Sequence, residues 1–130
     1  MNHLKVKKIV INIFKNFKLK EAHAKISAEY LIKAELLGAP SHGLSRLKMY
    51  CERLNKKIIN PNPKIKIKKI SQSISHIDAN NSIGFVAADL GIKIAIKNAK
   101  KTGIGLVAIK NSGHYGLSSF YAEQAVKKNL

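Results

Sequence analysis

The 130-residue chain is poor in cysteine, arginine and acidic residues, and each shortage excludes a class of structure or function. Its one cysteine, Cys51, excludes an internal disulfide and a metal cluster built from cysteines. No apolar run approaches the roughly 20 residues of a membrane helix. The apolar stretch 9–14 is too short for a signal peptide and is followed at once by Lys15. We therefore expect a cytoplasmic globular chain with no metal site and no membrane partner.

Acidic residues number only 7 against 24 lysines and arginines, which gives a formal net charge of +17. A surface dedicated to nucleic acid usually mixes in arginine for bidentate and stacked contacts. Here only Arg46 and Arg53 are arginine. Lysine, isoleucine and asparagine together make up 51 residues, and all three have AT-rich codons. We interpret the charge as nucleotide bias and expect no specific nucleic-acid partner, while a basic non-catalytic remnant or weak polyanion-binding module remains the alternative function.

The first half of the chain has the periodicity of three helices. Apolar residues recur at helical spacing between lysines over 4–18, which predicts the first helix of a domain; the alternative is a helix on a membrane surface. An Ala- and Leu-rich helix follows over 20–37 and stops at Gly38-Ala39-Pro40. A third helix is expected over 41–55, with Ser41 as its N-cap.

The second half reads as strands and helices in alternation. We first predict a half-exposed or edge strand at 64–70 and a strand at 73–78 that ends in an Asn-Asn-Ser turn at 80–82. A helix at 83–101 follows, with Val86, Leu90 and Ile94 facing inward. A buried strand at 104–109, a loop at 111–116 and a helix at 117–128 complete the order. The strand–helix–strand order predicts parallel strands with a right-handed crossover. The chain is thus expected to be α/β, with a helical segment over 1–63 and an incomplete α/β segment over 64–130.

The segment Ser41-His42-Gly43-Leu44-Ser45-Arg46 is the first candidate site. A histidine in the first turn of a helix faces the positive end of the helix dipole, which disfavours its protonated form. One turn later, Arg46 can present its guanidinium to a carboxylate, and Tyr50 follows on the same predicted face. The alternative interpretation is an ordinary capped helix with His42 and Arg46 in solvent.

The segment Asn111-Ser112-Gly113-His114-Tyr115-Gly116 is the second candidate. It follows the predicted buried strand at its carboxyl end, where ligands bind in open α/β sheets. Glycines on both sides of His114 allow a ligand to approach the backbone, although a lone loop histidine is more often structural. Gly103 and Gly105 precede a strand and lack a third glycine, so the Rossmann dinucleotide fingerprint is absent.

Taken in order, these segments resemble one family. The pieces are Ala34-Glu35-Leu36-Leu37-Gly38, Ser41-His42-Gly43 with Arg46 and Tyr50, Ile77-Asp78-Ala79-Asn80-Asn81 with Gly84, Lys101-Thr102-Gly103-Ile104-Gly105, and Asn111 to Gly116 with Tyr121-Ala122. From about residue 20 onward the chain resembles the N-terminal part of the malate/L-lactate dehydrogenase family, whose relatives include ureidoglycolate, sulfolactate and diketogulonate oxidoreductases. The family tends to have Asp at the position of Glu35 and Gln at that of Phe85, changes that we expect to leave the chemistry intact.

The resemblance implies a fold and a reaction. The fold would be the sulfolactate-dehydrogenase type, with N-terminal helices followed by part of a mixed α/β/α sheet that is not of the Rossmann type. The reaction would be hydride transfer between NAD or NADP and a small 2-hydroxy or 2-keto acid. Because family members are longer, we expect a truncated chain, inactive alone and homodimeric when complete.

The resemblance also implies roles for individual residues. His114 corresponds to the acid/base for the substrate hydroxyl, with His42 as rival proton donor or cofactor contact. Ser41, Arg46 and Tyr50 correspond to substrate-binding positions, with Arg46 as the clamp for the substrate carboxylate. The residues that build most of the cofactor site in relatives have no counterpart in this chain.

Overall fold

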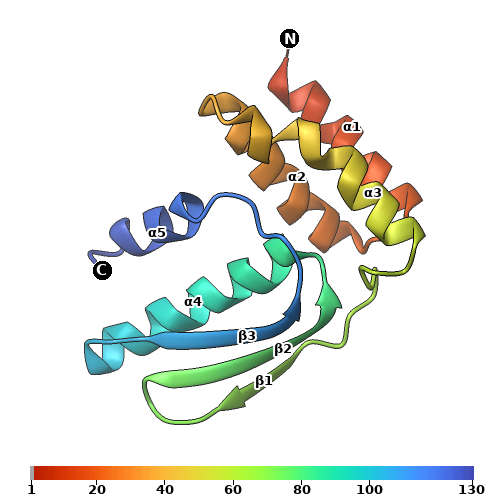
Figure 1. The fold of residues 1–130 in the computed structure, drawn as a ribbon. Coiled ribbons are helices and arrows are strands. Elements are labelled where there is room, and N and C mark those ends of the chain that lie inside the picture. Colours follow the sequence, from red (N-terminus) through yellow and green to blue (C-terminus); the bar gives the residue numbers. More distant parts are fainter. Residues whose placement is uncertain (1) are drawn as a thin grey trace. The chain divides into compact units, whose positions relative to one another are not determined.

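The computed structural model describes residues 2–130, and the chain forms two compact units, Met1–Asn62 and Pro63–Leu130. The first unit is helical (Figure 1), with α1 His3–Asn16, α2 Glu21–Leu36, the short 3-10 turns η1 Pro40–His42 and η2 Leu44–Arg46, and α3 Leu47–Asn55. The first two predicted helices are confirmed. Asn2 begins α1 by accepting the Leu4 N–H at 2.9 Å, which satisfies one of the unpaired donors at the helix start.

The helices of the first unit bury one apolar face each. Val10 and Phe14 of α1 are almost completely buried, as are the small residues Ala24 and Ala28 of α2. From α3, the Tyr50 ring meets the Phe14 ring edge to face, with centroids 6.5 Å apart. Burying an aromatic ring of this size contributes a large part of the stability of a small core. The solvated face of α1 carries the lysines, as its periodicity predicts.

The predicted third helix, 41–55, is wrong over its first turns. Ser41 is not an N-cap, because residues 40–42 form a 3-10 turn of their own and the α-helix begins only at Leu47. Gly43 separates η1 from η2 with an extended backbone at φ −98° and ψ −138°, which no α-helix accepts. The Ser41–Arg46 segment is therefore an ordered double turn that leads into α3.

The second unit is a three-stranded mixed sheet with two helices (Figure 1). Its elements are β1 Lys66–Lys69, β2 Ile74–Ser82, α4 Gly84–Thr102, β3 Leu106–Ser112 and α5 Ser119–Val126. The strand order is β1-β2-β3, with β1 antiparallel to β2 and β2 parallel to β3. The predicted strand–helix–strand unit and the α/β class with a mixed sheet are confirmed.

The strand β2 runs further than predicted. Asn80 and Asn81 were expected to end it in a turn, but both adopt left-handed backbone (φ 49° and 57°) inside the strand. The pairing with β3 shifts register between Asp78 and Ser82, so these residues form a bulge. Asparagine tolerates this conformation better than most residues, which explains how the strand continues past a turn-like sequence.

The core of the second unit lies between the sheet and α4. Ile77 and Ala79 of β2 are buried with Ala87 of α4, and Leu90 and Ile94 pack against them. The inward face predicted for this helix is confirmed. The helix ends at Gly103, which caps it in the left-handed conformation at φ 81°.

The prediction of a buried strand at 104–109 is wrong. Within residues 2–130, β3 is an edge strand paired only with β2, and Val107 is its one partly buried residue. Ile104 and Leu106 are 65% and 55% exposed. A continuous apolar run predicts burial on both faces, but α4 covers a single face of this sheet in the described residues.

Candidate active site

Three of the predicted site residues lie together in the first unit. The Ser41 hydroxyl and the His42 Nδ1 are 3.0 Å apart, within hydrogen-bond distance. Arg46 donates from Nε to the Ser41 carbonyl at 2.7 Å. This bond leaves the terminal Nη nitrogens of an exposed guanidinium to meet a ligand end-on. The Ser41–His42–Arg46 cluster thus offers a hydroxyl, an imidazole and a guanidinium within one short segment.

The helix-dipole argument for His42 fails in the structure. His42 lies in the 3-10 turn η1, and the next α-helix starts five residues later at Leu47. The dipole effect falls off within the first turn of a helix. His42 is instead oriented by its contact with the Ser41 hydroxyl.

Tyr50 does not share the exposed face of the cluster. It is 1% exposed and packs against Phe14 in the core of the first unit. Burial raises the pKa of the Tyr50 phenol well above its ordinary value. The predicted common face with Arg46 assumed one continuous helix from residue 41, and the break at Gly43 removes that relationship.

Sequence reasoning missed the part that Glu35 takes in this region. Its carboxylate Oε1 accepts the Leu44 N–H at 2.6 Å and lies directly against the Cα of Gly43. From the sequence, Glu35 stands out only as a replacement for the family's usual Asp, a change expected to leave the chemistry intact. No local pattern indicates the contact, because it joins positions nine residues apart in two different elements.

The His114 loop lies, as predicted, just past the carboxyl end of β3 in the second unit. The backbone carbonyls of Gly113 and His114 lie so close to Gly84 that a side chain there would collide with them. The Gly116 N–H donates to His114 Nδ1 at 3.4 Å, near the upper limit of a hydrogen bond. In the neutral ring this contact places the hydrogen on Nε2.

The start of this loop is tied to β2 by a polar network. Asp78 Oδ1 accepts from the Asn111 Nδ2 at 2.9 Å and from the Asn80 N–H at 3.0 Å. The Asn111 and Asn80 hydrogen bonds hold the pKa of the Asp78 carboxyl below its usual range. Asn111 itself has left-handed backbone at φ 53°, so the strand turns sharply into the loop there.

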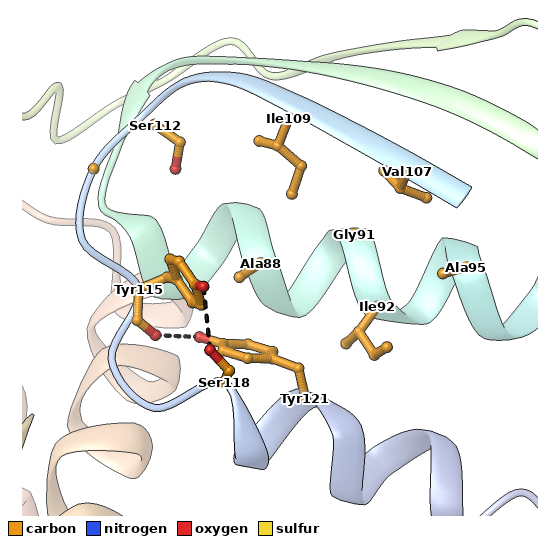
Figure 2. Close-up of a pocket in the computed structure, with 11 residues that line it drawn as sticks. Ala88, Gly91, Ile92, Ala95, Val107, Ile109, Ser112, Tyr115, Ser118 and Tyr121 are labelled. Carbon is orange, nitrogen blue, oxygen red and sulfur yellow. Dashed lines mark hydrogen bonds between the residues drawn. The ribbon is translucent and has the colours of Figure 1, made fainter. Parts of the chain in front are cut away.

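A hollow of about 460 Å³ opens beside the loop, between α4, β3 and the first turn of α5 (Figure 2). Along α4 it is lined by the small residues Ala88, Gly91 and Ala95, together with Ile92. At its polar end the Tyr121 hydroxyl donates to the Tyr115 carbonyl at 2.5 Å, and the Tyr115 and Ser118 hydroxyls are 3.2 Å apart. These bonds fix the loop on the side away from β2.

Neither a metal site nor a membrane-spanning helix is formed by residues 2–130. No group of three or more His, Cys, Asp or Glu side chains there is arranged to hold a metal ion. Within the same residues, no helix combines the length and the apolar character needed to cross a bilayer.

Residues 1–130 match the family model described as malate/L-lactate dehydrogenase. The chain belongs to the malate/L-lactate dehydrogenase family. It is 38% identical over 124 residues to the L-sulfolactate dehydrogenase of Methanocaldococcus jannaschii. It is 36% identical over 112 residues to a protein of Escherichia coli O157:H7 named ureidoglycolate dehydrogenase (NAD(+)).

Solved structures of the family agree. The malate dehydrogenase of Pyrococcus horikoshii matches with a TM-score of 0.93 at 35% identity, over 97% of this chain and 36% of that one. The M. jannaschii sulfolactate dehydrogenase matches with a TM-score of 0.91 at 38% identity, over 95% of this chain and 36% of that one. The sequence match to the M. jannaschii enzyme likewise covers 95% of this chain and 36% of the enzyme. The chain therefore spans about a third of the length of the dehydrogenases that it matches.

Proposed function

We propose that the chain forms the substrate-binding and proton-transfer part of an oxidoreductase that acts on a small 2-hydroxy acid, with NAD or NADP as hydride partner. The observation that carries the proposal is the Ser41–His42–Arg46 cluster, in which an exposed guanidinium and an imidazole are both hydrogen-bonded to Ser41. The relatives named above are called dehydrogenases of malate, sulfolactate and ureidoglycolate. A guanidinium is the side chain best matched to the carboxylate of such an acid.

The nicotinamide group, when bound, accepts the hydride from the hydroxyl-bearing carbon or returns it to the keto acid. A dinucleotide diphosphate often binds at the start of the helix after the first strand of a parallel pair. Here the carbonyls of Gly113 and His114 occupy the space over Gly84 at the start of α4. This end of α4 does not fit a diphosphate, and from the described residues we assign to the cofactor only His42, as a candidate contact.

In the proposed mechanism Arg46 binds the substrate carboxylate end-on through its Nη nitrogens. His114 exchanges the proton of the substrate hydroxyl, and His42 donates a hydrogen bond that orients the substrate. To accept a proton at Nε2, His114 must give up the Gly116 contact and carry its hydrogen on Nδ1. A bond of 3.4 Å is weak, so the loss of the Gly116 contact costs little.

The test is a dehydrogenase assay on two proteins: the chain alone, and a chimera in which it replaces the matching N-terminal third of the M. jannaschii enzyme. Formation of reduced nicotinamide is followed with malate, lactate, sulfolactate and ureidoglycolate, each with NAD and with NADP. We expect turnover in the chimera and none in the chain alone. A folded chimera that oxidises none of the acids with either cofactor contradicts the proposal.

A further inference from the structure

The Glu35 side chain connects the end of α2 to the turn that carries Ser41, His42 and Arg46. We infer that Glu35 is a positioning residue, which holds this turn in the arrangement that binding of a substrate carboxylate requires. The inference rests on the function proposed above. It is argued from the 2.6 Å bond between the Leu44 N–H and Glu35 Oε1, which joins the end of α2 to the start of η2.

The electrostatics of the two helix ends explain why a carboxylate is placed there. Glu35 lies in the last turn of α2, where the negative end of the helix dipole disfavours an acidic side chain. Leu44 is the first residue of η2, which leads directly into α3. The residue before Leu44 is Gly43, which has no side chain that could accept a hydrogen bond from the backbone N–H groups at the start of η2. Glu35 therefore acts as an N-cap supplied from another helix.

The contact with Gly43 makes the arrangement specific. Gly43 is buried, and any β-carbon at that position would overlap the Glu35 carboxylate. The Gly43 carbonyl in turn accepts the Arg46 N–H at 3.0 Å. Arg46 then donates from Nε to the Ser41 carbonyl at 2.7 Å. A continuous series of hydrogen bonds and backbone links thus runs from Glu35 through Leu44 and Gly43 to Arg46 and Ser41.

The experiment uses the full chain labelled for NMR, as wild type and as the variants Glu35→Ala and Glu35→Gln. The matched control is Glu52→Ala, since Glu52 is an exposed acidic residue of the same unit whose ion pair with Lys48 is long at 4.0 Å. We expect Glu35→Ala to raise the exchange rate of the Leu44 amide about tenfold or more, the effect of losing a hydrogen bond to a charged group. It should also move the Arg46 Nε–H and His42 ring signals.

Glu35→Gln should restore most of the protection, because its side-chain oxygen has the same reach. Glu52→Ala should leave all three signals in place. The inference is overturned if Glu35→Ala folds with the Leu44, Arg46 and His42 signals unchanged. If Glu35→Ala does not fold, the Glu35→Gln variant decides. Relative to wild type, its Leu44 amide proton must shift upfield more than any amide proton outside residues 41–46. An unshifted Leu44 amide proton overturns the inference.

The chimera separates this inference from the proposed function. There Glu35→Ala should lower kcat/KM for the 2-hydroxy acid about tenfold, mainly through KM, with partial rescue by Glu35→Gln. A wild-type chimera without turnover contradicts the proposed function, while the NMR signals still decide whether Glu35 holds the turn. An active chimera in which Glu35→Ala keeps full kcat/KM overturns the positioning role and leaves the proposed function standing.

Discussion

The Asp78 carboxylate and the Asn111 side-chain amide are joined by a 2.9 Å hydrogen bond that links β2 to the last residues of β3 before the His114 loop. Asp78 Oδ2 also lies 3.6 Å from the Lys110 ammonium. The carboxylate therefore holds two consecutive residues at the point where β3 ends. The end of β3 from which the His114 loop starts is thus tied to an acidic residue on the neighbouring strand.

We predict that Asp78→Asn destabilises the chain at neutral pH and that the difference from wild type disappears in acid. The folded-state pKa of Asp78 is lowered, mainly by the Asn111 amide. A lowered pKa stabilises the fold above the unfolded value, about 3.9 for Asp, and this contribution is lost as the pH falls through the folded value. Thermal midpoints of both proteins between neutral pH and about pH 3 measure the convergence. Parallel curves for the two proteins would contradict the assignment, and Glu52→Gln serves as the control.

Gly84→Ala should destabilise the second unit by roughly 1–3 kcal/mol. A glycine replaced by alanine in a helix normally gains stability, so the sign is diagnostic. At Gly84 the new β-carbon meets the backbone carbonyls of Gly113 and His114, which cannot rotate away. At Gly91, in the same helix, it meets the flexible end of the Ile109 side chain. Urea unfolding of both variants is the measurement, and a Gly84→Ala protein as stable as Gly91→Ala would show that the contact is loose.

In the active chimera, Arg46→Lys should lower kcat/KM by about 10- to 150-fold, from a lost charge-assisted contact of roughly 1.5–3 kcal/mol. Lysine offers a point charge where the end-on guanidinium offers two parallel donors. Lysine also cannot hold the Ser41 carbonyl from the same position as Nε. Steady-state kinetics with the 2-hydroxy acid check this, and Arg53→Lys on α3 is the control. Wild-type kcat/KM in Arg46→Lys would rule out the clamp.

The roles of His114 and His42 should separate in the pH profile of the chimera. We expect His114→Gln to lose most of the rate and the ionisation on the acidic limb of kcat/KM. His42→Gln should keep that limb at reduced activity, because a residue that only donates a hydrogen bond does not titrate in the reaction. The opposite pattern would assign proton transfer to His42.

Elements whose boundaries depend on nearby residues were predictable. Helix α4 has a regular apolar face and a glycine cap at Gly103, both visible in the sequence, and it forms as expected. The helical crossover between β2 and β3 predicted parallel strands, and so placed the His114 loop past the carboxyl end of β3. These signals act within one helix or one strand–helix–strand unit.

Features that depend on distant contacts were not predictable. The helix α3 begins at Leu47 after a break at Gly43, where Glu35 from another helix caps Leu44, and no local pattern contains that bond. The exposure of the β3 side chains arises because α4 covers a single face of the sheet in the described residues, which the apolar sequence of β3 does not specify. Tyr50 shows the same limit, because its periodicity fits either an exposed site face or the core that it occupies.

The free edge of β3 and the net charge of +17 together determine how self-association of the chain depends on salt. An exposed edge strand with apolar side chains such as Leu106 invites pairing with another copy of the chain. Like charges keep such copies apart at low ionic strength, and added salt shortens that repulsion to about 10 Å or less. Salt therefore promotes self-association of this chain while it weakens binding to any polyanion, so the two kinds of association respond to ionic strength in opposite directions.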